Sequence, residues 1–146
     1  MNLSKDVKIT VVEAAAVAGT SELVSDVLDM QGYEGVMFIA LTGDVTSGSE
    51  ITLTIKGNTA NSTSSPSPVT QKATTLFTAG ATDADSKAIV VDLYKPAMRY
   101  VFASLTRATQ NAVIGGVIAI QYQAGLKPTT NDASVIASAF GLGVTA

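Results

Sequence analysis

The stretch that decides the fold is residues 33–57, YEGVMFIALTGDVTSGSEITLTIKG. In residues 50–57, EITLTIKG, apolar and polar side chains alternate, which predicts a strand with one buried and one wet face. Residues 33–42 are apolar on both sides of the same alternation, so we expect a strand that is covered on both faces. The joining segment GDVTSGS is rich in turn-forming residues. The two strands are therefore expected to form a hairpin.

Five more segments have the β-branched and apolar residues typical of strands, with Gly, Pro, Asn and Ser turns between them. They are residues 5–12, 23–30, 87–95, 98–107 and 112–123. The first of these carries two lysines, which favours an edge or arm strand. The second fits either a short helix or a strand, and we favour the strand.

The segment 112–123, AVIGGVIAIQYQ, predicts a strand with two apolar faces. Simple alternation places Ile114 and Ile118 on one face and Val117 on the other, so we expect both faces to be buried. The two central glycines, Gly115 and Gly116, predict a bulge or a close backbone approach.

Outside these strands, two kinds of segment remain. Residues 58–72, NTANSTSSPSPVTQK, are too polar to bury apolar surface and are expected to form a long, exposed and mobile loop. The ends are expected to extend as an arm at about residues 1–13 and a tail at about residues 127–146, whose apolar stretch ASVIASAFGLGV needs a partner. Together the pattern predicts an all-β fold: one jelly-roll-like β-sandwich domain, residues 1–146, of seven or eight short antiparallel strands.

Composition excludes most catalytic chemistry. The 146 residues include no Cys and no His, which removes disulfides, thiol chemistry and His-based catalytic or metal groups. The Asp83–Ser86 segment begins like a calcium loop, but Lys87, Ala88 and Tyr94 stand where an EF-hand needs a ligand, a glycine and a glutamate. No sequence feature places two carboxylates across a cleft. We therefore predict no enzyme activity, no cofactor and no metal.

Membrane and nucleic-acid partners are also not expected. The longest apolar stretch, residues 112–120, is half the length that a membrane-spanning helix needs. Glu13 interrupts the apolar N-terminal segment, so we expect no export signal. The net charge of −3 is not that of a dedicated nucleic-acid binder. Strand anatomy explains the basic residues near Tyr94, Tyr100 and Phe102 better than base stacking does.

Only 14% of the residues are charged, and the mean hydropathy is +0.34. The predicted strands therefore carry more apolar surface than a single domain is expected to bury in its own core. This composition favours burial against other chains. It indicates an assembly protein.

Two segments carry a resemblance to a known family. Residues 92–122 contain LYKPAMRY (93–100) and a Thr-Arg turn (106–107) before an apolar strand, and residues 27–43 contain a Gly-Tyr-Glu step before another. These segments resemble the second half and the opening strands of the small head-decoration, or cement, proteins of tailed bacteriophages.

The resemblance implies a structural role on a virion. Proteins of this type sit on the outer surface of the capsid as dimers or trimers and bridge neighbouring major capsid subunits, having been made in the host cytoplasm. The expected interface combines basic side chains with apolar tail residues: Lys5, Lys8, Lys95, Arg99, Arg107, Val135, Ile136, Phe140 and Leu142. Two alternatives stay open. One is another virion component of the tail, fibre or head-completion kind, and the other is a carbohydrate-binding module that uses Tyr33, Tyr94 or Tyr122.

Overall fold

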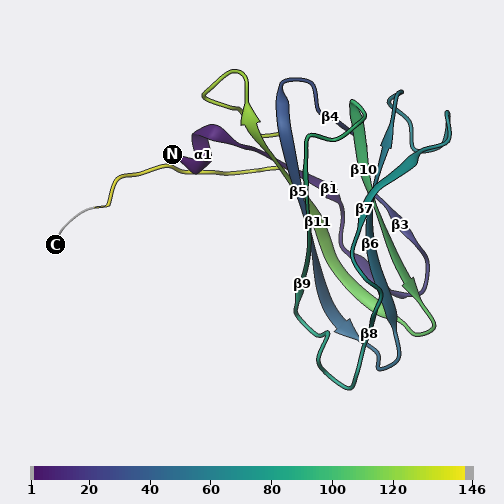
Figure 1. The fold of residues 1–146 in the computed structure, drawn as a ribbon. Coiled ribbons are helices and arrows are strands. Elements are labelled where there is room, and N and C mark those ends of the chain that lie inside the picture. The colour runs from purple at the N-terminus through teal and green to yellow at the C-terminus, as the bar shows by residue number, and fades with distance from the viewer. Residues whose placement is uncertain (1, 144–146) are drawn as a thin grey trace.

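The computed structural model describes residues 2–143 and folds most of them into two packed β-sheets (Figure 1). Met1 of the predicted arm and residues 144–146 of the predicted tail lie outside the described residues. The described elements are α1 (Leu3–Asp6), β1 (Lys8–Glu13), β2 (Ala16–Gly19), β3 (Leu23–Val24), β4 (Leu28–Asp29), β5 (Tyr33–Val45), β6 (Glu50–Asn58), β7 (Val69–Ala73), β8 (Phe77–Thr78), β9 (Ala88–Tyr94), β10 (Tyr100–Ala108) and β11 (Ala112–Ala124).

The strand order is that of a jelly roll. One sheet runs β1-β11-β5-β9, with β2 also paired to β11, and the other runs β3-β10-β6-β7, with β4 on β10 and β8 on β6. Because β1 with β2, β3 with β4, and β7 with β8 share positions, the described strands fill eight places. If the eight places are numbered in chain order, the first sheet has the order 1-8-3-6 and the second sheet has the order 2-7-4-5. This is the strand order of a jelly roll. The predicted antiparallel β-sandwich is confirmed.

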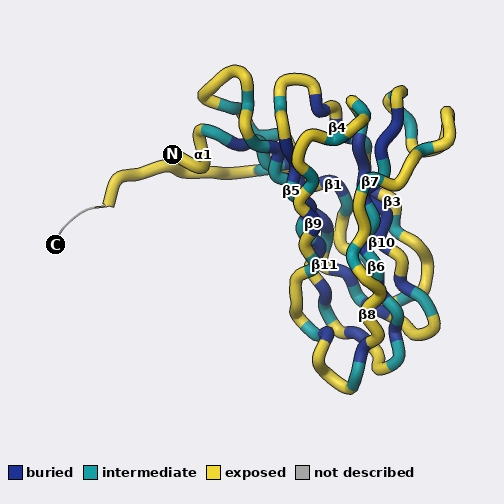
Figure 2. The backbone as a smooth tube through the Cα atoms, in the orientation of Figure 1, coloured by how far each residue is buried: buried dark blue, intermediate teal, exposed yellow. Residues whose placement is uncertain are grey.

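The core lies between the inner faces of the two sheets. Val36, Phe38 and Ala40 of β5 face Leu53 and Ile55 of β6, and all five side chains are fully buried. Figure 2 shows buried positions alternating with more exposed ones along the strands of both sheets. Period-two alternation in the sequence thus becomes one buried face on each sheet.

The predicted hairpin between residues 33–42 and 50–57 is wrong. The strands β5 and β6 lie in opposite sheets, where β5 pairs with β11 and β9, and β6 pairs with β10 and β7. The connection crosses the end of the sandwich, where Gly48 donates a hydrogen bond from its N–H to the Ala79 carbonyl. Turn-forming residues serve a sheet-to-sheet crossing as well as a hairpin. In this arrangement the inner face of β5 and the apolar face of β6 bury each other.

A bulge at Gly115 and Gly116 sets the faces of β11. The pairing of β11 with β5 shifts register between Ile114 and Gly116, as the glycine pair predicted, and Gly116 has a φ of +129°. The extra residue turns Ile114 to the core side with Val117, whereas Ile118 lies on the outer side and is only partly buried. The predicted grouping of Ile114 with Ile118, and the predicted burial of both faces, are therefore corrected.

Two other predictions hold in part. Residues 23–30 are extended, but they divide into β3 and β4 because the Ser25 hydroxyl accepts the N–H of Ala103 in β10.

The predicted loop 58–72 is shorter than expected, since β6 includes Asn58 and β7 begins at Val69. The Asn58 side chain is buried and donates hydrogen bonds to the carbonyls of Ser62 and Pro66, which folds the loop back on itself.

Arg107 does not lie on the surface, contrary to its expected interface role. It faces inward from β10 and is 5% exposed. Its guanidinium donates hydrogen bonds to the carbonyls of Val17, Ser21 and Ala112 at 2.6–2.8 Å. Arg107 therefore ties the β2–β3 connection to the end of the sandwich.

This arrangement predicts that Arg107→Met destabilises the fold. The substitution leaves three carbonyls without their charged donor, so we expect a loss of about 3 kcal/mol or more in the free energy of unfolding, measured by urea denaturation. Arg99→Met is the matched control, because Arg99 is exposed and its removal is expected to change the free energy of unfolding little. Equal losses for the two variants would contradict the role assigned to Arg107.

Candidate interaction surface

The outer face of the β1-β11-β5-β9 sheet is apolar across all four strands. The registers place Val11, Ile118, Ile39 and Val90 in one row, with one residue from each strand. Neighbouring rows add further apolar side chains on the same face. We call the whole set the apolar sheet face, and its members are Ile9, Val11, Met37, Ile39, Leu41, Val90, Ile118 and Ile120.

This face is incompletely covered by the described chain. Leu41 is 48% exposed, Val90 47% and Val11 39%, and the other members are partly buried. Scattered exposed apolar residues are normal in a monomer, whereas a large contiguous apolar patch is a candidate interaction site. The sequence predicted that both faces of residues 33–42 and 112–123 would be covered. Residues 2–143 fully cover only the inner face of these strands.

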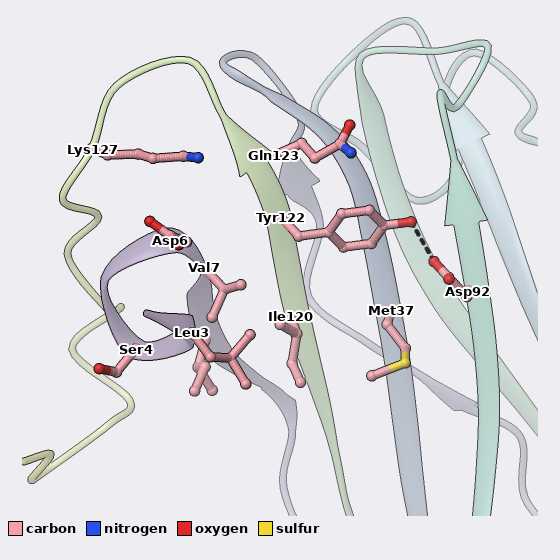
Figure 3. Close-up of a pocket in the computed structure, with 11 residues that line it drawn as sticks. Leu3, Ser4, Asp6, Val7, Met37, Asp92, Ile120, Tyr122, Gln123 and Lys127 are labelled. Carbon is pink, nitrogen blue, oxygen red and sulfur yellow. Dashed lines mark hydrogen bonds between the residues drawn. The ribbon is translucent and has the colours of Figure 1, made fainter. Parts of the chain in front are cut away.

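A groove of about 760 Å³ opens at one end of the apolar sheet face, beside α1. Figure 3 shows Leu3 and Val7 on one side of it, Ile120 between, and Met37 and Tyr122 across the sheet. Charged groups are confined to its rim, where Asp6, Asp92 and Lys127 also line it. No sequence pattern predicted this groove, because Leu3 is far from β5 and β11 in the chain and periodicity within one segment does not indicate such distant contacts.

Two tyrosine rings lie parallel next to the groove. Tyr122 of β11 covers Gly35 of β5, where an added Cβ would collide with the ring, so glycine is required for this close approach. Tyr94 of β9 is parallel to Tyr122 within 7°, with ring centroids 6.4 Å apart. The Tyr122 hydroxyl donates to Asp92 at 2.6 Å, which fixes the ring orientation.

The first part of the C-terminal tail covers the edge of β1. Asn131 and Ser134 accept the N–H groups of Ile9 and Val11 with their side chains, at 3.0 and 2.9 Å, and the Asp132 N–H donates to the Ile9 carbonyl. The position of β1 at a sheet edge is as predicted, and the tail satisfies its free backbone groups.

Beyond Ser134 the tail leaves the domain. A turn closed by the Val135 N–H and the Asp132 carbonyl redirects the chain, and Figure 1 shows the following segment extending away from both sheets. Ile136 is 99% exposed, Leu142 84% and Phe140 49%.

The predicted basic residues do not form one patch. Lys5 lies on α1 with its Nζ 5.5 Å from the centre of the Phe140 ring, and Lys8 is partly buried in β1. Lys95 follows β9, with its Nζ 5.4 Å from the centre of the Tyr94 ring. Arg99 is engaged by Asp29 at 2.8 Å, and its hydrogen bond lowers the pKa of Asp29 to about 2. Its charge is therefore already matched within the chain.

The acidic side chains of the predicted calcium-like segment have structural partners. Asp83 and Asp85 accept the backbone N–H groups of Gly80 and Val45 in the turn before β9. Among residues 2–143 there is no group of three or more acidic side chains placed to hold a metal ion. In the same part of the chain, no helix has the length and apolar character needed to cross a membrane.

Comparison with solved structures supports the fold. The PBSX exported protein XepA matches with a TM-score of 0.54 and 18% identity, over 97% of this chain and 45% of the XepA chain. The two proteins share a fold, and this chain spans less than half the length of XepA. A chain of desmodium yellow mottle tymovirus matches 82% of this chain and 90% of its own length at 14% identity, with a TM-score of 0.33 that supports no inference. No family model and no curated protein sequence matches.

The environment of Tyr122 predicts an abnormal titration. Burial and the hydrogen bond to Asp92 raise the pKa of Tyr122 to about 12. Because the unfolded-state pKa is about 10, the folded protein holds this proton more tightly, and the resulting stability is lost as pH rises from about 10 towards 12. In an alkaline absorbance titration, one phenol is expected to ionise late. Asp92→Asn should lower its pKa, and Tyr122→Phe should remove the late step, whereas an unchanged late step in Tyr122→Phe would assign it to another tyrosine.

Proposed function

We propose that this protein is a structural virion protein that decorates the outside of a tailed-phage capsid and cements it by bridging major capsid subunits, as a dimer or trimer. Three features support this proposal. The jelly roll is a fold used by viral capsid proteins. Residues 27–43 and 92–122 resemble the strands of head-decoration proteins. An apolar sheet face and an apolar tail lack a covering layer within residues 2–143.

The apolar sheet face is the observation that carries the proposal. Burying apolar surface is worth about 25 cal/mol per Å², and a specific interface of about 1,000 Å² or more is enough for stable association. A face that extends over four strands suits a broad contact with a shell better than it suits a small ligand. Within the apolar sheet face, Ile39, Leu41 and Val90 lie outside the groove, and they would contact capsid subunits.

Cementing would work by mass action. A protein that binds the assembled shell and not its separated subunits stabilises the shell by its binding free energy, repeated at every copy. Lys5 and Lys95, which lie next to the two edge strands β1 and β9, would add contacts to acidic capsid surface. Arg99 would contribute less, because Asp29 already pairs with it.

Binding to purified, expanded heads tests this function. Val90→Glu and Leu41→Glu each place a charge in the apolar sheet face at a half-exposed position, so both variants should fold normally and bind heads at least about tenfold more weakly, or about 1.4 kcal/mol. Val69→Glu is the matched control, because Val69 is 49% exposed on β7, which belongs to the other sheet.

Particle composition distinguishes this role from another virion role. Quantitative mass spectrometry of virions is expected to find hundreds of copies per particle. Tens of copies would indicate a tail, fibre or head-completion component. Wild-type head binding by both Val90→Glu and Leu41→Glu would remove the apolar sheet face from the proposal.

The parallel tyrosines favour carbohydrate binding as a second candidate function. Tyr94 is 51% exposed and parallel to Tyr122, and the exposed side chains of Asp92 and Glu34 bond the two hydroxyls. The negative faces of such rings attract the C–H groups of a sugar ring, and the carboxylates can accept hydroxyl protons. Tyr33 takes no part in this pair, because it packs against the core. Reproducible binding on a glycan array that Tyr94→Ala abolishes would favour this function.

A further inference from the structure

The tail beyond Ser134 has the amino-acid composition of a buried segment. Residues 133–143, ASVIASAFGLG, contain no charged side chain, yet Ile136, Phe140 and Leu142 are largely exposed. Burial of such a segment requires no desolvation of charge, and it would remove three large apolar side chains from water. Its direction of departure is fixed, because residues 129–134 are hydrogen-bonded along β1 and the turn at Asp132–Val135 follows.

The groove beside α1 is the matching concave surface. Its apolar lining includes Leu3, Val7, Met37 and Ile120. A segment of about eight extended residues reaches at most about 27 Å, which is long enough to span a groove lined by α1 and by four strands, β1, β11, β5 and β9.

The groove cannot take the tail of its own chain in the described arrangement. Phe140 lies against Lys5 on α1, and Figure 3 shows the chain after Lys127 on the side of α1 away from Ile120. We infer that residues 135–143 of one copy seat in the groove of a second copy, with Ile136, Phe140 and Leu142 against Leu3, Met37 and Ile120. This inference rests on the self-association that is part of the proposed function, and it names the residues that meet.

Reciprocal exchange would close a twofold dimer, and head-to-tail exchange would close a ring. In both cases the same residues meet, so one experiment tests either arrangement. The two segments that flank the contact, α1 and the tail clamped on β1, belong to one end of the domain, so each copy presents a donor and an acceptor next to each other (Figure 1).

Disulfide trapping provides the test, because the chain has no cysteine of its own. A tagged full-length copy with Leu142→Cys is mixed with an untagged copy with Met37→Cys and oxidised mildly. A bridge requires Cα atoms within about 7 Å. We expect a mixed disulfide dimer at several times the yield obtained when Val17→Cys replaces Met37→Cys in the untagged copy.

Three results would overturn the inference. They are a mixed-dimer yield no higher than that of the Val17→Cys control, a bridge that forms within one chain when Leu142→Cys and Met37→Cys are combined, and unchanged oligomer mass in a chain that ends at Ser134. For that shortened chain we expect a wild-type melting curve and a monomer mass by light scattering, at concentrations where the full chain associates.

Head binding separates this inference from the proposed function. If the tail exchanges between copies but heads are not bound, the capsid role fails and the exchange stands. If heads are bound by a protein whose tail gives only control yields of mixed dimer, the exchange fails and the capsid role stands.

Discussion

The pairing of β11 with β5 is the constraint on which the other features of the structure depend. It joins two strands that are apolar on both faces, and it places them side by side in the middle of one sheet. One apolar face of each strand closes the core against β6 and β10. The other face is left on the outside, because one sandwich has only one interior. The apolar sheet face is therefore a direct result of this pairing.

The bulge at Gly115 and Gly116 makes this pairing possible over the full length of β11. Without an extra residue, Ile114 would point away from the core while Val117 pointed into it. Only glycine readily adopts the positive φ that Gly116 has here, and its missing side chain also leaves room for the Glu13 carbonyl. The local shift thus determines which isoleucines face the core and which face outward.

The edge of the same sheet is managed by the chain itself. The side chains of Asn131 and Ser134 occupy the N–H groups of β1 that would otherwise invite another strand. This edge is therefore closed to strand pairing at Ile9 and Val11, whereas the apolar sheet face stays incompletely covered within residues 2–143.

Strand predictions from the sequence succeeded where one face alternates, as in residues 50–57, and where a glycine pair marks a bulge. They failed for the connection between β5 and β6, because turn-forming residues do not say whether the next strand pairs beside the last or faces it. Arg107 was misplaced for a related reason. Its charge suggested a surface position, and only the folded chain brings the carbonyls of Val17, Ser21 and Ala112 around it.

The sequence by itself determined that the chain is all-β, that it lacks the side chains of most catalytic sites, and that it holds more apolar strand than one core needs. These properties follow from composition and from local periodicity, which are independent of how the strands are arranged. Only the tertiary structure decided which apolar residues remain uncovered, that a groove lies between α1 and β11, and that Tyr94 and Tyr122 are parallel. Each of these depends on contacts between segments far apart in the chain, and a local pattern contains no information on such contacts.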